Sequence, residues 1–269
     1  MKLMGIVNAT PDSFSDPGRH DPGELAERGR ALAQAGAAVV DVGGESGRTD
    51  REPVPEAVEA ARVVPVIERL AADGLTVSVD TWRAQVAREA LEAGAAMVND
   101  PSGLYEPEVA DACAVHGAAL VITHTRVPPK QKAFPAYDDV VADVVGTVTG
   151  LAERAVARGV RPDGVLIDPA HDFGKNTRHS LEVTRRLDEL VSTGWPVLVS
   201  LSRKDFVGET LDLPPDDRLE GTLAATALSA WLGARVFRAH DVTATRRVLD
   251  TVAAIRGTRP PAVARRGLA

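Results

Sequence analysis

The chain has 269 residues, of which 44% are hydrophobic and 26% are charged, and 38 acidic against 31 basic residues give a net charge of −7. This composition excludes a disordered chain, a collagen-like chain and a protein whose general basic surface binds nucleic acid. The length suits one large domain or two small ones, and because no linker or composition shift divides the sequence, we expect one domain over residues 1–269.

Short β-branched runs alternate with stretches rich in Ala, Leu, Arg and Glu along the whole chain. In chain order, the expected strands are 3–7, 38–43, 76–80, 97–100, 119–124, 165–168, 196–202 and 236–241. Each is followed by a loop and an expected helix, and the helices end at Gly36, Gly74, Gly94, Gly117, Gly159, Gly194, Gly233 and Gly257. Glycine suits the residue after a helix, because that residue often takes a positive φ.

The strands are continuous apolar runs, which is typical of parallel strands covered on both faces. Eight strand–helix units in about 250 residues predict an α/β protein of the (β/α)8 TIM-barrel class. An open doubly wound sheet is the alternative, although no G-x-G-x-x-G follows the first strand, which weakens a dinucleotide-binding version of it. Residues 259–269 follow the last helix and are expected to form a short surface tail.

In such barrels the active site lies at the C-terminal ends of the strands, and polar side chains stand at all of these ends. One set offers two carboxylates, an amide and an ammonium, which suits a flat heterocycle with donor and acceptor edges: Asp80, Asn99, Asp168 and Lys204. Any single carboxylate there could instead cap the next helix. We interpret Asp41 and Asp100 as structural residues held by backbone donors.

A second set, Arg48, Arg238 and His240, forms a cationic corner that suits a phosphate or pyrophosphate. Asn8 offers an oxygen ligand for Mg²⁺, which prefers oxygen and retains waters. A zinc site is not expected, because there is no H-E-x-x-H and no cysteine cluster. The chain lacks the G-x-S-x-G of serine nucleophiles, and we interpret its one cysteine, Cys113, as a core residue.

Several segments resemble the dihydropteroate synthase family. They are residues 8–16 (NATPDSFSD), 41–46 (DVGGES), 78–81 (SVDT), 98–100 (VND), 201–204 (LSRK) and 238–241 (RAHD). The similarity runs in order from about residue 3 to residue 257, and the first and fifth segments are highly specific together. In other segments the chain departs from the usual family pattern, and in this it resembles a divergent second-copy branch of the family.

The resemblance implies a (β/α)8 barrel that joins 6-hydroxymethyl-7,8-dihydropterin pyrophosphate to 4-aminobenzoate in folate biosynthesis, releasing pyrophosphate. The family mechanism is SN1-like and passes through a pterin methylene cation. By position, the pterin would be held by Asp80, Asn99, Asp168 and Lys204, with Asp80, Asp168 and Lys204 as catalytic residues. Asn8 would bind Mg²⁺, and the pyrophosphate would be held by Arg48, Arg238 and His240.

The departures fall on the acceptor side. The family usually has Ser-Thr-Arg-Pro where this chain has Gly47 and Thr49 in residues 46–49, and Ser-Arg-Lys-Ser where it has Asp205. In the family that last serine, at a helix start, helps receive the aminobenzoate carboxylate. Asp205 therefore either repels a carboxylate or caps its helix while pointing away. The usual Gly-Phe-Gly-Phe-Gly-Lys reads AHDFGK at 170–175, which keeps Phe173 and adds His171 and Asp172.

Two functions follow from the altered acceptor pocket of Gly47, Phe173 and Asp205. The first is a dihydropteroate synthase-type transferase acting on 4-aminobenzoate. The alternative is a divergent paralogue that binds the pterin pyrophosphate but lacks that activity or uses a different acceptor.

No stretch approaches the roughly 20 apolar residues of a membrane span. The apolar stretch at the N-terminus is too short for a signal peptide, and a single cysteine cannot form an internal disulfide, so we expect a cytoplasmic protein. We expect small-molecule substrates and no nucleic-acid or membrane partner. The resemblance suggests a homodimer.

Overall fold

The computed structural model of the chain describes residues 1–10, 21–47 and 52–267. The predictions that concern residues 11–16, Arg48 and Thr49 therefore lie outside the described residues.

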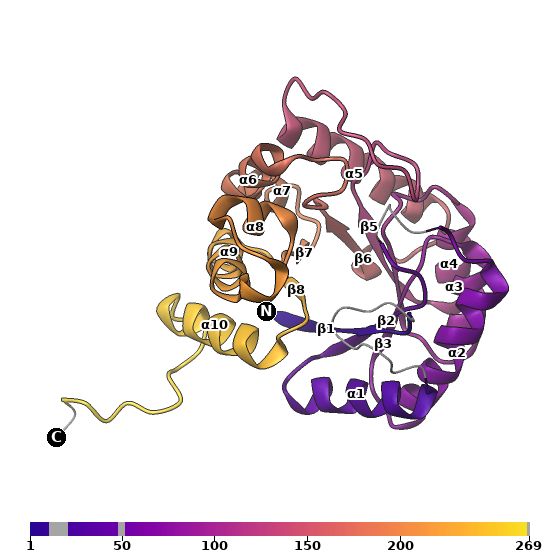
Figure 1. Cartoon of the computed structure of the whole chain (residues 1–269), viewed down its shortest axis with the longest axis horizontal. Coiled ribbons are helices and arrows are strands. Elements are labelled where there is room, and N and C mark those ends of the chain that lie inside the picture. Colours follow the sequence, from indigo (N-terminus) through magenta and orange to yellow (C-terminus); the bar gives the residue numbers. More distant parts are fainter. Residues whose placement is uncertain (11–20, 48–51, 268–269) are drawn as a thin grey trace.

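Eight parallel strands form one sheet that curves into a nearly closed barrel (Figure 1). The strands are β1 Lys2–Asn8, β2 Val39–Gly43, β3 Val77–Asp80, β4 Met97–Asp100, β5 Ala119–Thr123, β6 Val165–Asp168, β7 Leu198–Ser200 and β8 Val236–Ala239. Their order is β6-β5-β4-β3-β2-β1-β8-β7, and a parallel bridge from Ile167 to Val197 joins the two edges. The predicted TIM-barrel fold is confirmed.

The helices lie outside the ring of strands (Figure 1). They are α1 Pro22–Gln34, α2 Glu56–Ala72, α3 Ala84–Glu92, α4 Glu108–His116, α5 Val140–Ala157, α6 Thr177–Arg185, α7 Leu187–Val191, α8 Asp205–Leu211, α9 Leu219–Leu232 and α10 Val242–Ile255. Two short 3-10 turns, η1 Pro162–Gly164 and η2 Pro215–Asp217, precede β6 and α9. All eight glycines predicted to end helices have a positive φ, from 64° at Gly117 to 115° at Gly233.

Side-chain caps fix where several helices begin. Asp21 accepts a hydrogen bond from the Glu24 backbone N–H at 3.1 Å, and Pro22 follows it with its φ already suited to a helix. Asp139 caps α5 by accepting from the Val141 and Ala142 backbone N–H groups at 2.9 and 3.1 Å. Among the described residues, no helix has both the length and the apolar character needed to cross a membrane.

The strands near the barrel seam are shorter than the sequence predicts. The expected strand 196–202 is reduced to Leu198–Ser200, and the expected strand 236–241 ends at Ala239. The reason is that Ser202 and His240 hydrogen-bond to each other at the mouth, where the His240 backbone N–H donates to the Ser202 hydroxyl at 3.3 Å. Past the last helix, residues 259–267 are exposed and trail away from the barrel, as the sequence predicts (Figure 1).

Candidate active site

The side chains that face the barrel interior change from apolar to polar along the strands. The lower interior is filled by buried apolar side chains, namely Met4, Val39, Val121, Leu166, Leu198 and Val236. Side chains alternate between the two faces of a strand, so the residue two positions later also faces inward. On five of these strands that next position holds Asp41, Thr123, Asp168, Ser200 or Arg238. A polar layer therefore lies above the apolar plug, at the end where barrels place their active sites.

Arg238 lies at the centre of this polar layer. Its Nε donates to Asp41 Oδ2 and its Nη2 donates to Asp80 Oδ2, both at 2.6 Å. Asn99 Nδ2 donates to the same Asp41 oxygen at 3.1 Å, which ties β4 into the cluster. The Arg238 side chain is 16% exposed and that of Asp41 is fully buried, so these charges depend on one another.

Of the two carboxylates in this cluster, that of Asp80 is 23% exposed and can still interact with a ligand. Burial raises the pKa of Asp80 to about 7, while Arg238 opposes this rise and the neighbouring Asp41 adds to it. A carboxyl that titrates near neutrality can exchange a proton with a bound heterocycle. The second oxygen of Asp41, Oδ1, is buried and has no hydrogen-bond partner in the described part of the chain. This oxygen is closed off from solvent, so the unsatisfied acceptor lies inside the cluster.

Asp168 and Lys204 form the other half of the polar layer. Asp168 Oδ1 accepts from the Ala170 backbone N–H at 2.7 Å, and burial raises its pKa while Lys204 opposes the rise. The Lys204 ammonium donates to the His171 carbonyl oxygen and lies 4.8 Å from the centre of the Phe173 ring. Burial lowers the pKa of Lys204, whereas Asp172 and Asp168 oppose this lowering. A carboxylate, an ammonium and an aromatic face are thus held together on one side of the barrel.

The two described residues of the cationic corner expected for pyrophosphate, Arg238 and His240, carry less free positive charge than the sequence suggests. Arg238 is already matched by Asp41 and Asp80. His240 Nδ1 pairs with the Ser202 hydroxyl at 3.0 Å, and burial lowers the pKa of His240 to about 4, with Arg238 and Arg203 adding to the effect. The imidazole is therefore neutral at pH 7 in this form. The role assigned to Arg238 and His240 stays a prediction.

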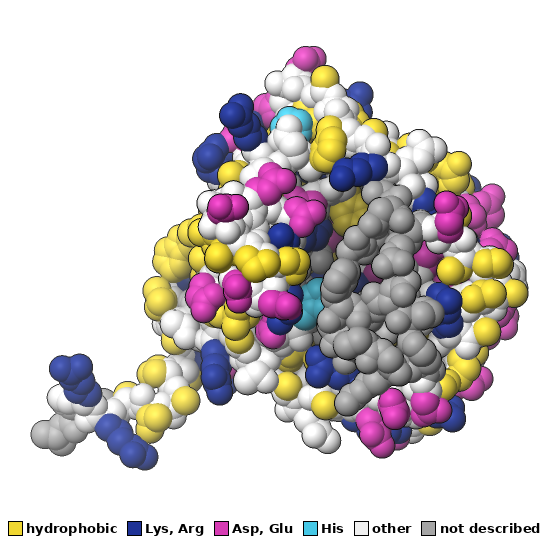
Figure 2. All heavy atoms as spheres, in the orientation of Figure 1, with side chains coloured by type: hydrophobic (Ala, Val, Ile, Leu, Met, Phe, Trp, Pro, Cys, Tyr) yellow, Lys and Arg dark blue, Asp and Glu magenta, His cyan; other side chains and the backbone are white. Residues whose placement is uncertain are grey.

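The acceptor side brings together two of the residues that the sequence singles out. A Cβ on Gly47 would lie 4.0 Å from the Phe173 ring, which is ordinary van der Waals contact. Asp205 is placed differently, because its carboxylate pairs with Arg218 at 2.9 Å and is 80% exposed. It points away, as one of the two interpretations expected, but it does not cap its own helix. Figure 2 shows acidic side chains gathered over α8 and the segment after it.

The start of α8 is capped from the β6–α6 loop. Asp172 Oδ2 accepts from the Phe206 backbone N–H at 3.2 Å, and Asp172 Oδ1 accepts from the Ser180 hydroxyl at 2.9 Å. Beside it, the His171 ring is buried, contacts Thr184 Oγ1 at 3.0 Å and stacks on Phe206 with ring centres 5.4 Å apart. The two residues that depart from the family pattern in this loop are thus packed against α8.

Asn8 ends β1 at the mouth of the barrel and is half-buried. Among the residues that the structure describes, no three His, Cys, Asp or Glu side chains come together as a metal site. A single amide oxygen fits Mg²⁺ only as one ligand among phosphate oxygens and waters, which is how proteins often hold this ion.

Sequence reasoning misjudged Asp41 and passed over Lys175. Asp41 is bound by the side chains of Arg238 and Asn99, whereas Asp100 is held by the Ser102 and Leu104 backbone N–H groups at 2.7 and 2.8 Å, as expected. The signal for Asp41 is its position two residues after the inward-facing Val39 on β2.

Lys175 holds the β6–α6 loop in place through hydrogen bonds from its buried ammonium. It is 1% exposed, and its Nζ contacts His124 Nδ1 at 2.7 Å and donates to the Ala170 and Phe173 carbonyl oxygens at 3.2 and 3.3 Å. His124 Nε2 in turn pairs with Asp143 Oδ1 at 2.8 Å. The same loop supplies the His171 carbonyl and the Phe173 ring to Lys204, so these buried contacts help to position the Lys204 ammonium.

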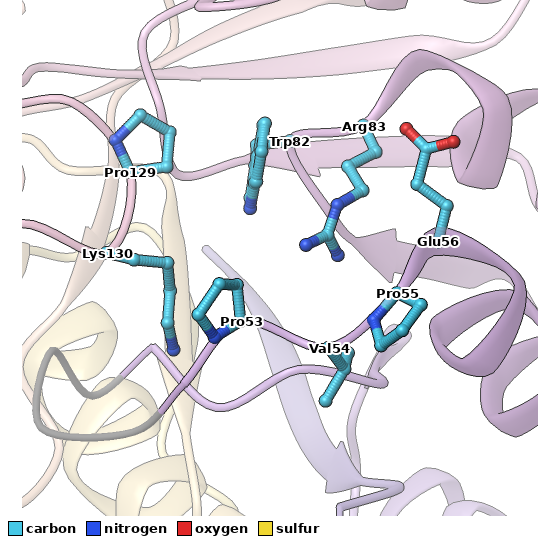
Figure 3. Close-up of a pocket in the computed structure, with 8 residues that line it drawn as sticks. All are labelled: Pro53, Val54, Pro55, Glu56, Trp82, Arg83, Pro129 and Lys130. Atoms are coloured by element: carbon cyan, nitrogen blue, oxygen red, sulfur yellow. The ribbon is translucent and has the colours of Figure 1, made fainter.

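A cavity of about 460 Å³ lies between the loops after β2, β3 and β5 (Figure 3). Its lining residues are Pro53, Val54, Pro55, Glu56, Trp82, Arg83, Pro129 and Lys130. Glu45 joins two of these loops, because it accepts hydrogen bonds from the Val54 backbone N–H at 2.8 Å and from the Trp82 indole at 3.1 Å. The cavity therefore belongs to the wall that supports the segment around Gly47.

The chain is similar to known proteins along nearly its whole length. Residues 4–240 match the family of pterin binding enzymes. The chain is 53% identical to the inactive dihydropteroate synthase 2 of Mycobacterium leprae, covering 99% of this chain and 94% of that protein. It is 42% identical to the dihydropteroate synthase of the same organism, covering 94% and 93%. The structure of Xanthomonas albilineans dihydropteroate synthase with 4-aminobenzoic acid is 40% identical, with a TM-score of 0.88, covering 98% of this chain and 94% of that one.

Proposed function

The chain belongs to the family of pterin-binding enzymes, as its motifs predict, and from this we propose that its polar layer binds 6-hydroxymethyl-7,8-dihydropterin pyrophosphate. The observation that carries the proposal is the convergence of Asp80, Asn99, Asp168 and Lys204 around Arg238 inside the barrel. The carboxylates and the amide suit the donor edge of the pterin ring, and the ammonium suits its carbonyl oxygen or ring nitrogen.

The residues of this layer fit a reaction that passes through a pterin methylene cation. The bond between the methylene carbon and the pyrophosphate oxygen breaks, and the pyrophosphate leaves with the electron pair. Asp80 and Asp168, held in a low-dielectric interior, would stabilise the positive charge that develops on the pterin. Arg238 and His240 would receive the leaving group, together with Arg48.

Mg²⁺ fits this proposal as a partner of the pyrophosphate. Asn8 would hold it through its amide oxygen, and the bound ion would neutralise charge on the departing pyrophosphate.

We propose that condensation with 4-aminobenzoate is slow or lost in this chain. Support comes from relatives such as the inactive dihydropteroate synthase 2 of Mycobacterium tuberculosis, 51% identical, and from the changed acceptor side at Gly47 and Asp205. The second candidate is full dihydropteroate synthase activity, which the assembled pterin-side residues and the 40% identity to the Bacillus subtilis dihydropteroate synthase favour.

One experiment tests both candidates. The purified protein is mixed with the pterin pyrophosphate, 4-aminobenzoate and Mg²⁺, pterin binding is measured by calorimetry, and 7,8-dihydropteroate is sought by mass spectrometry. Pterin binding without product supports the proposal, and product at an enzyme-like rate supports the second candidate. If the pterin pyrophosphate does not bind, both are wrong.

We also propose a homodimer through the late helices. The support is a set of exposed apolar side chains on and around α8 and α9, namely Leu211, Leu213, Leu228 and Trp231, beside a run of small residues from Gly221 to Ala227. A cytoplasmic location suits the buried free thiol of Cys113, whose pKa burial raises to about 12.

A further inference from the structure

Asp172 holds a backbone conformation that favours glycine. Its φ is 69°, and that of Ala170 two residues earlier is 58°, so both lie in the left-handed region. A side chain there is strained, and contacts that glycine could not make can offset that strain. Asp is one of the few residues that tolerate this region. What the Asp172 side chain contributes is a pair of contacts, from the Ser180 hydroxyl and the Phe206 backbone N–H.

The Asp172 carboxylate is fixed in place at the barrel mouth. Its own backbone N–H donates to the Ser180 hydroxyl at 3.0 Å, and that hydroxyl donates back to Asp172 Oδ1 at 2.9 Å. Its other oxygen, Oδ2, accepts a hydrogen bond from the backbone N–H of Phe206, the second residue of α8. Ser180 is fully buried, so this arrangement does not exchange freely with water. The negative charge therefore lies next to the first turn of α8.

The same charge acts on the Lys204 ammonium, which lies 4.8 Å from the centre of the Phe173 ring. Asp172 is the strongest of the carboxylates that oppose the lowering of the Lys204 pKa by burial, ahead of Asp168. Lys204 also donates to the carbonyl of His171, the residue before Asp172. The positive charge of Lys204 is thus balanced from within the chain. An anionic ligand would gain little from it.

The surroundings of α8 add to this negative field. Six acidic side chains are exposed on α8, on the segment after it and at the start of α9: Asp205, Glu209, Asp212, Asp216, Asp217 and Glu220 (Figure 2). Asp205 and Asp216 are paired with Arg218 and Arg203, and the other four carboxylates repel an approaching anion and attract a cation.

We propose that Asp172 is a specificity-determining residue that excludes carboxylate-bearing acceptors and reserves the site for a neutral or cationic aromatic amine. This inference rests on the proposed function, because it names the partner for the pterin methylene carbon. The amine nitrogen forms a bond to that carbon, the carbon–oxygen bond breaks, and pyrophosphate leaves with the electron pair. The nitrogen then loses one proton to water.

The test compares three amines of one shape that differ in charge: 4-aminobenzoate, 4-aminobenzamide and 4-aminobenzamidine. Their affinities are measured by calorimetry with the full chain, in the presence and absence of 6-hydroxymethylpterin, pyrophosphate and Mg²⁺, a mixture that cannot react. We expect the unmodified protein to bind the amide and the amidine at least about tenfold more tightly than the carboxylate.

The decisive variant is Asp172→Asn, because asparagine tolerates a positive φ and can still bond to Ser180 and Phe206. It should lower the preference for the uncharged amide by about tenfold or more. Asp217→Asn removes a charge from the same exposed acidic face and should change the preference less than about twofold.

Three outcomes overturn the inference: an unchanged preference in Asp172→Asn, equal affinities for the carboxylate and the amide in the unmodified protein, or no measurable binding of the amide and the amidine. In the first of these cases, a preference that shifts in Asp205→Asn instead would assign the effect to Asp205. Binding of the pterin mixture is measured separately in the same samples. Its absence would contradict the proposed function, while the acceptor preference measured without it still tests the role of Asp172.

Discussion

Arg238 and Asp41 lie 2.6 Å apart inside the barrel, on the two strands that flank β1. In the sheet register, Met4 of β1 pairs with Arg238 on one side and with Val39 on the other, so Asp41 lies two residues further along the register than Arg238. This contact links the β8 side of the polar layer to Asn99 on β4. It also offsets part of the positive charge that Arg238 would offer to a pyrophosphate.

Asp41→Asn should destabilise the fold. It leaves the buried Arg238 with one carboxylate in place of two, and breaking a buried ion pair costs about 3 kcal/mol. Urea unfolding measures the loss. The matched control is Asp73→Asn, because Asp73 pairs with Arg30 at a similar 2.7 Å but on the surface, and its removal should cost less than about 1 kcal/mol. Equal losses in the two variants would contradict the proposed burial of the Arg238 pair.

Lys204→Ala should weaken pterin binding by about 10- to 100-fold, since a hydrogen bond from a charged donor is worth roughly 1.5–3 kcal/mol. Titration with 6-hydroxymethylpterin measures the affinity. Lys2→Ala, which removes an exposed lysine at the start of β1, serves as the control and should bind like the unmodified protein. Unchanged binding in Lys204→Ala would show that the pterin does not lie against this ammonium.

The fold was predictable because glycine and apolar periodicity act locally. Gly36 and Gly233 mark helix ends through a backbone need that holds in any tertiary context, and both have positive φ. The strand ends near the seam were not predictable to the residue. There, the contact between Ser202 and His240 replaces strand pairing, and it joins residues 38 positions apart.

The site was predictable by residue type but not by pairing. The sequence shows that Asp80, Asn99, Asp168 and Lys204 end different strands, and a barrel gathers strand ends. It does not show with which carboxylates Arg238 pairs, because several inward-facing carboxylates from different strands lie within reach of the guanidinium. The capping of α8 by Asp172 was hidden for the same reason, since Phe206 lies 34 residues further along the chain.

Binding of pyrophosphate should take up a proton through His240. Burial, with Arg238 and Arg203, lowers the pKa of His240 to about 4, so the free protein holds it neutral at pH 6. A nearby pyrophosphate favours the charged imidazole and raises that pKa. We expect uptake of up to about one proton per site near pH 6. Calorimetry in buffers of different ionisation enthalpy measures it, and His240→Asn should remove it. Equal uptake by both proteins would place the anion elsewhere.

The stability of the chain should rise with pH above neutrality because of Lys175. Burial lowers the pKa of Lys175 to about 7, with Lys204 adding to the effect and Asp168 opposing it. An unfolded lysine titrates near 10.4, so between about pH 7 and 10 the unfolded chain binds the extra proton. The free energy of unfolding therefore increases through that window, by at most about 1.4 kcal/mol per pH unit. Below pH 7 the cost of charging Lys175 inside the fold is constant.

Lys175→Met isolates this contribution. The variant loses the contacts of the ammonium with His124 and two carbonyls, and it also loses the cost of charging Lys175 inside the fold, so its absolute stability does not isolate the titration. Its slope is the informative quantity. Between pH 7.5 and 9.5 the unmodified protein should gain roughly 2 kcal/mol over the variant in urea unfolding, because only the unmodified protein has a lysine there to titrate. Lys2→Met, on the surface, should keep the slope of the unmodified protein. Parallel pH profiles for all three proteins would mean that Lys175 stays protonated in the fold, and its contact with His124 would then be that of an ammonium with a neutral imidazole.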